Sequence, residues 1–148
     1  MAIDSATRSV PADLRAWAKG IYPTEAAVQL LLQAFDGRFA RPGWPWIKTT
    51  ASGNHYLDAA RLSDDHIGVL SGGERRVLAI TRSLLGEQPV DLADALAGLD
   101  RPTSRIVLDA LMHATGTGTK TTETDLATAA ANGRLRKPHR DRSTGISR

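Results

Sequence analysis

The stretch from residue 70 to residue 86, LSGGERRVLAITRSLLG, carries the start signal, amphipathic body and stop signal of a helix. Ser71 stands three residues before Glu74, the spacing at which a serine and a glutamate side chain cap a first turn reciprocally. Apolar residues then recur at helical intervals on one face. Gly86 supplies the left-handed residue at which helices commonly end. We therefore predict a helix that packs one face against the rest of the chain.

Similar start and stop signals delimit further helices on both sides of this one. Serine, aspartate and proline at the starts and glycine at the ends predict helices near residues 9–20, 23–37, 63–70, 90–98 and 100–116. The helix at 23–37 is apolar around much of its circumference, so we expect it at the centre of the core. Residues 46–58 place β-prone residues on both sides of a Ser-Gly-Asn turn, which predicts a hairpin. The predicted fold is mainly α, a small helical domain of about five short helices with one inserted β-hairpin.

Length and charge predict one domain followed by a basic tail. The 148 residues have room for a single domain, which we place at residues 9–116 after a disordered N-terminus at residues 1–8. Residues 117–148 lose apolar periodicity and are expected to be largely disordered. Residues 132–148 hold six Lys or Arg and one acid, so residues 1–131 are slightly acidic. The net charge of +3 is therefore a property of the tail.

Several classes of protein are disfavoured by what the sequence lacks. It has no cysteine, which excludes disulfides, thiol catalysis and cysteine-ligated metals. No run approaches the roughly 18 apolar residues of a membrane span, and the first residues lack the apolar core of a signal peptide. We therefore expect a cytoplasmic protein that does not bind membranes. The four histidines have no companions at ligand spacing, and no catalytic motif is present, so we expect no metal, no cofactor and no enzymatic activity.

Residues 70–75, LSGGER, resemble the signature motif of ABC-type ATPases. The resemblance implies that a serine, glycine amides and a helix N-terminus face the γ-phosphate of ATP across a dimer, which suits the anion affinity of a helix start. The phosphate-binding loop that accompanies such a motif, G-x-x-x-x-G-K-[ST], does not occur in the chain. We interpret the segment first as a helix cap, and keep a nucleotide-associated protein as an alternative.

Residues 90–113 resemble a helix-turn-helix, with a short helix, a glycine-containing turn and a second helix that begins with polar residues. The resemblance implies major-groove contacts from the start of the second helix. The basic tail would add phosphate contacts. The candidate nucleic-acid-binding residues are Arg101, Thr103, Ser104, Arg105, Arg134, Arg136 and Lys137. Two consecutive core helices joined by a capped turn explain the same residues.

The aromatic cluster around Trp44 and Trp46 suggests a third possibility. Such a cluster can form a protein-binding patch, although tryptophans that flank a hairpin more often clamp it onto a core. We therefore expect a small non-enzymatic binding or adaptor protein whose leading partner is nucleic acid. The alternative is a protein–protein interaction module with no nucleic-acid role.

Overall fold

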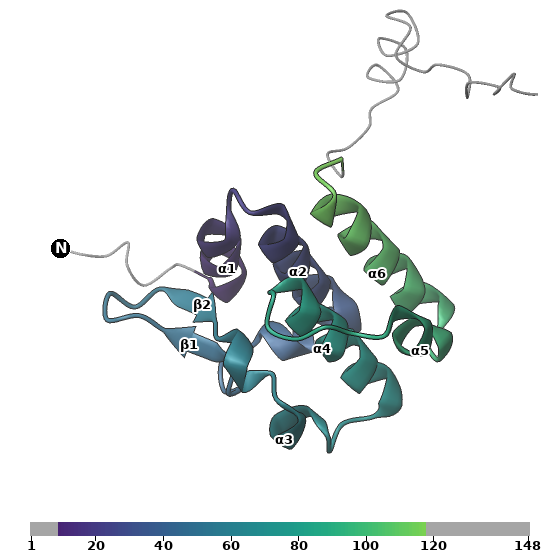
Figure 1. Ribbon diagram of the computed structural model, residues 1–148. Helices are drawn as coiled ribbons and strands as arrows, with labels where there is room; N and C mark the ends of the chain where they lie inside the picture. The colour runs from purple at the N-terminus through teal and green to yellow at the C-terminus, as the bar shows by residue number, and fades with distance from the viewer. Residues whose placement is uncertain (1–8, 118–148) are drawn as a thin grey trace, which may run out of the picture. The chain divides into compact units, whose positions relative to one another are not determined.

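The computed structural model describes residues 9–117 of the chain. In this part, six α-helices, two 3-10 segments and one antiparallel pair of strands form a mainly α fold with an inserted hairpin, as predicted (Figure 1). The elements in chain order are α1 (Val10–Ala18), α2 (Tyr22–Gln33), η2 (Ala34–Ala40), β1 (Ile47–Thr49), β2 (His55–Leu57), η3 (Ala59–Arg61), α3 (Asp64–Ile67), α4 (Gly72–Leu84), α5 (Leu92–Ala97) and α6 (Arg101–Ala114). None of the described helices is long and apolar enough to cross a bilayer. Disorder was predicted for residues 1–8 and 117–148, of which residues 1–8 and 118–148 lie outside the described residues.

Side-chain caps start most of the longer helices where the sequence predicts them. At α4, the Ser71 hydroxyl accepts from the Glu74 backbone N–H at 3.3 Å, and the Glu74 carboxylate accepts from the Ser71 N–H at 3.1 Å. At the starts of α1, α5 and α6, the side chains of Ser9, Asp91 and Asp100 each accept from the backbone N–H three residues further on, without a reciprocal bond. Because each cap satisfies backbone donors that a helix start leaves unpaired, these residues fix where the helices begin.

The central helix is α2, which packs against α1, α4 and α6 (Figure 1). Its position confirms the prediction made from its apolar circumference, but its predicted end at Gly37 is wrong. The helix ends at Gln33, since Phe35 and Asp36 adopt left-handed backbone conformations with φ of 52° and 57°. Such a conformation is unfavourable for a bulky residue. Here it turns the chain so that Phe39 enters the core, where it is fully buried.

The buried side chains form two clusters on either side of α2. The first joins α1, the hairpin and one side of α2, and includes Leu14, Leu31, Phe39, Trp46, Leu57, Leu62 and Leu78. The second joins the other side of α2 to α4, α5 and α6, and includes Ala26, Leu30, Val77, Ile80, Ala95, Val107 and Ala110. The two clusters explain why α2 is apolar over so much of its surface.

The tryptophans hold the hairpin against the helices. Trp46 is fully buried, and its indole N–H donates to the Phe39 carbonyl at 2.8 Å. The Trp44 ring stacks on it with centroids 4.9 Å apart and planes 9° apart. The tryptophans thus hold the hairpin against the helical core, which is the more frequent role of such a cluster. Of the two candidate protein-binding residues, Trp46 has no exposed surface and Trp44 is half-buried.

Candidate functional site

The segment that resembles a helix-turn-helix folds into two helices at the predicted places, but they do not pack as that motif does. The motif requires its two helices to brace each other so that the second enters the major groove. Here α5 packs mainly against α4, and α6 packs mainly against α2. The arrangement corresponds to consecutive core helices joined by a capped turn, the alternative left open above.

The structure separates the residues predicted to contact DNA. Arg101 and Arg105 are exposed on α6, and Ser104 is half-buried. Thr103 is 7% exposed, so its side chain is not accessible for the predicted contact with a base edge. Its side chain belongs to the buried face of an amphipathic helix, which places every third or fourth residue in the core. The tail candidates Arg134, Arg136 and Lys137 lie outside the described residues.

One side of α6 forms an exposed stripe made of Arg101, Arg105, Leu108 and Met112, which we call the α6 stripe. These residues are spaced by four, three and four positions, so they share one face of the helix. Leu108 is 57% exposed and Met112 is 59% exposed, although large apolar side chains of this kind usually lie in a core. Neither arginine has an ion-pair or hydrogen-bond partner within residues 9–117. Within the described residues, the α6 stripe therefore combines two cations that have no ion-pair partner with two exposed apolar side chains.

The segment that resembles the ABC signature is engaged in contacts of its own. The Glu74 carboxylate caps the Ser71 N–H and also forms an ion pair with Arg38 at 2.6 Å. A carboxylate of the chain thus occupies the helix start at which a phosphate would bind. The neighbouring cavity of about 400 Å³ is lined by three arginines and three aspartates: Arg75, Arg76, Arg82, Asp64, Asp91 and Asp94. These contacts support the interpretation as a helix cap.

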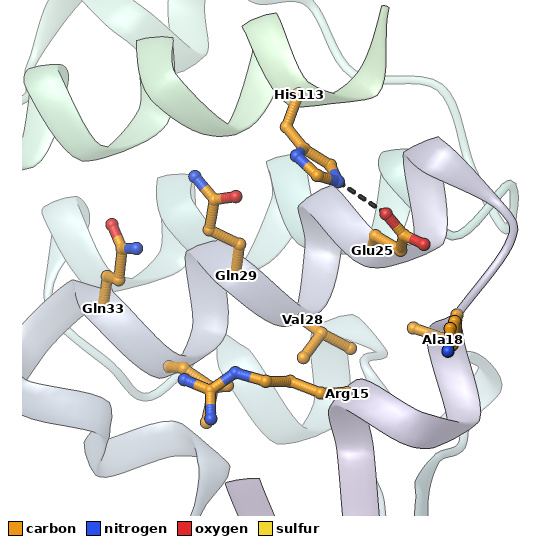
Figure 2. A pocket seen from close by; sticks show the side chains of 9 residues that line it. Arg15, Ala18, Glu25, Val28, Gln29, Gln33 and His113 are labelled. Carbon is orange, nitrogen blue, oxygen red and sulfur yellow. Dashed lines mark hydrogen bonds and ion pairs between the residues drawn. The ribbon is translucent and has the colours of Figure 1, made fainter. Parts of the chain in front are cut away.

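A second cavity, of about 330 Å³, lies between α1, α2 and the C-terminal end of α6 (Figure 2). Its floor is apolar, formed by Ala18, Val28 and Leu32, and its rim is polar. The polar side chains of the rim are Arg15, Lys19, Glu25, Gln29, Gln33 and His113. Sequence analysis found none of them, because the cavity joins residues from the first quarter of the chain to one near residue 113.

Glu25 and His113 close one end of this cavity (Figure 2). The Glu25 carboxylate accepts from the Gly20 backbone N–H at 2.7 Å and lies 2.7 Å from His113 Nε2. These hydrogen bonds, with that from Gly20 the larger effect, hold the pKa of Glu25 below its ordinary value of 4.5. Because an ionised carboxylate can only accept, Nε2 of His113 carries the proton. The pair ties α6 to the start of α2.

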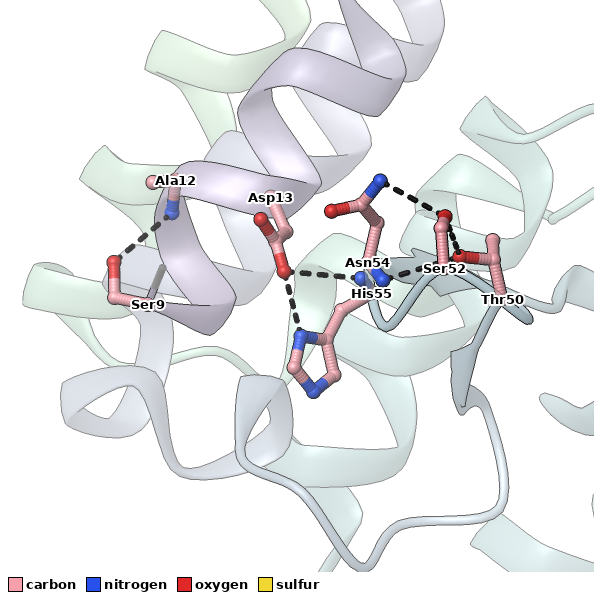
Figure 3. Close-up of polar contacts among 7 residues, drawn as sticks. All are labelled: Ser9, Ala12, Asp13, Thr50, Ser52, Asn54 and His55. Carbon is pink, nitrogen blue, oxygen red and sulfur yellow. Dashed lines mark hydrogen bonds and ion pairs between the residues drawn. The ribbon is translucent and has the colours of Figure 1, made fainter. Parts of the chain in front are cut away.

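A buried carboxylate joins α1 to the hairpin (Figure 3). Asp13 is 4% exposed, and its Oδ2 accepts from the His55 backbone N–H at 3.1 Å and from His55 Nδ1 at 2.7 Å. His55 lies 42 residues from Asp13 in the sequence, so no local pattern indicates this contact. An aspartate that orients an imidazole also occurs in catalytic and metal sites. The described residues contain no group of three side chains that could hold a metal ion. The contact links α1 to the hairpin.

No protein-family model matches the chain, and no match was found among curated proteins or among solved structures.

Proposed function

We propose that the protein is a non-enzymatic adaptor that binds an acidic, amphipathic segment of a partner protein through the α6 stripe. The observation that carries this proposal is the exposure of Leu108 and Met112 on one helix face, next to two arginines that have no partner among residues 9–117. Adjacent apolar side chains left in water favour a partner that covers them.

The spacing of the stripe indicates the form of the partner. The distance along the helix axis from Arg101 to Met112 is about 16 Å at 1.5 Å per residue. A partner helix of about three turns matches this length, and helices are commonly recognised through anchors at such spacing. Its acidic side chains would face Arg101 and Arg105, and its apolar side chains would cover Leu108 and Met112. A single helix face is a small interface, so we expect weak, transient binding.

The same surface suits nucleic acid less well. Affinity for nucleic acid derives mainly from cations placed along the phosphate backbone. The α6 stripe offers cations only in its first half, and exposed Leu108 and Met112 occupy the second half.

Fluorescence anisotropy with two labelled probes tests the proposal on the full chain. The first probe is a helical peptide with glutamates and leucines at the complementary spacing, and the second is a duplex DNA. We expect the peptide to bind, and the double variant Arg101→Glu/Arg105→Glu to weaken it by about tenfold or more through like-charge repulsion. A control of equal charge change, Arg41→Glu/Arg61→Glu, should bind as the unmodified chain does.

The apolar half of the stripe is tested separately. The double variant Leu108→Ser/Met112→Ser should bind the peptide more weakly. Val69→Ser should bind it as the unmodified chain does, because Val69 is 86% exposed but lies outside the stripe. If the duplex binds tightly through Arg101 and Arg105 while the peptide does not bind, the partner is nucleic acid and the proposal is wrong. Equal peptide binding by all variants would also overturn it.

A further inference from the structure

We infer that the cavity between α1, α2 and α6 is a binding site for a small organic anion with a short apolar body. This inference is independent of the proposed function, since it uses a different surface. The cavity volume of about 330 Å³ lies at the small end of the range for ligand sites. An apolar floor with a few polar groups at its rim is the usual composition of such a site.

The charges of the rim favour an anion. Arg15 and Lys19 come from the last two turns of α1 and its end, and neither has a hydrogen-bond or ion-pair partner within residues 9–117. The Glu25 carboxylate also lines the cavity, but the Gly20 N–H and His113 already satisfy its two oxygens. Lys19 interacts electrostatically with the Glu25 carboxylate without forming an ion pair or a hydrogen bond with it. The rim therefore holds two cations that have no direct partner among residues 9–117. Arginine binds carboxylates and phosphates through paired N–H donors.

The amide groups and the apolar floor of the cavity indicate which other chemical groups the ligand has. Gln29 and Gln33 follow Glu25 at intervals of four residues on α2, so their amides line the same side of the cavity (Figure 2). Both amides offer donors and an acceptor for a polar group. Val28 is buried and Leu32 half-buried in the floor, which suits a chain of a few carbon atoms. Carboxylate and phosphate head groups fit the two cations equally well.

NMR titration of the ¹⁵N-labelled full chain tests the inference with four probes: hexanoate, hexyl phosphate, acetate and inorganic phosphate. We expect saturable shifts of the Gln29 and Gln33 side-chain amide signals with the two hexyl probes. Acetate and inorganic phosphate should bind at least about tenfold more weakly, because they lack the carbon chain that covers the floor of the cavity. The hexyl probe that binds more tightly identifies the head group.

Matched variants assign the charge requirement. Arg15→Gln and Lys19→Gln should each lower the affinity for the tighter-binding hexyl probe by about tenfold, the effect of losing a charged hydrogen bond. Arg41→Gln and Lys48→Gln remove cations elsewhere on the domain and should leave this affinity unchanged. Arg15→Lys keeps the charge and should retain most of the binding, which separates loss of charge from loss of fold. The inference is wrong if the amide shifts do not saturate. It is equally wrong if Arg15→Gln and Lys19→Gln bind as well as the controls, or if acetate matches hexanoate and inorganic phosphate matches hexyl phosphate.

Discussion

Replacing Asp13 by alanine should destabilise the protein more than any exposed substitution, because the carboxylate is buried and accepts hydrogen bonds from His55. Its Oδ2 accepts from the backbone N–H and from Nδ1 of His55, at 3.1 and 2.7 Å (Figure 3). A buried donor left without an acceptor costs about 1–3 kcal/mol. The His55 side chain retains 20% exposure, so water can partly satisfy its ring. We therefore expect Asp13→Ala to lower the free energy of unfolding by about 2–4 kcal/mol.

Urea unfolding followed by circular dichroism measures this loss, with two further variants to isolate the pair. His55→Ala removes the ring donor, and the double variant Asp13→Ala/His55→Ala removes both side chains. If the contact is direct, the double variant should lose about 1–3 kcal/mol less than the sum of the two single variants. Asp109→Ala is the control, since Asp109 is exposed on α6 and should change stability by less than about 0.5 kcal/mol. An Asp13→Ala variant as stable as this control, or strictly additive losses, would refute the reasoning.

Three further predictions follow from the contacts described. Glu25→Gln removes a carboxylate whose pKa is lowered in the folded state by Gly20 and His113. The stability that the ionised Glu25 contributes is present above its unfolded pKa of 4.5 and is lost as the pH falls through its lowered folded pKa. The original chain should therefore lose more thermal stability on acidification than the variant. Melting temperatures that fall equally with pH in both proteins would contradict this. Ser71→Ala should cost about 1 kcal/mol in urea unfolding, and Ser71→Asp, which keeps a cap, should cost clearly less. Trp46→Ala should cost about 3–5 kcal/mol or prevent folding, which a near-native melting temperature would disprove.

Local signals predicted the helices because their caps act over three or four residues. The capping box of Ser71 and Glu74 is such a signal, and it appears in the structure as predicted. The hairpin was also predictable, since its strands flank turn residues and pair in a simple register. The end of α2 was not predictable in this way. The left-handed conformations of Phe35 and Asp36 accompany the burial of Phe39 in the core, a contact between distant parts of the chain that no local signal indicates.

The candidate sites were harder to predict than the fold, because their residues are brought together only by packing. His113 and Glu25 are separated by 88 positions, and nothing near either residue indicates the other. The prediction of a DNA-reading helix identified the exposed Arg101 and Arg105 but also included buried Thr103. Helical periodicity distinguishes the two faces of α6, and it would have placed Thr103 with Val107 and Ala110 on the buried side.

The most direct test of the adaptor proposal selects binding peptides without assuming their sequence. A display library of random helical peptides is selected against the full chain, and the enriched peptides are measured with each α6 variant. The proposal predicts peptides that combine acidic and apolar residues at helical spacing. It also predicts that they lose binding to both Arg101→Glu/Arg105→Glu and Leu108→Ser/Met112→Ser. Enriched peptides that lack acidic residues, or that bind these variants as well as the unmodified chain, would contradict the assignment of the α6 stripe as the partner-binding surface.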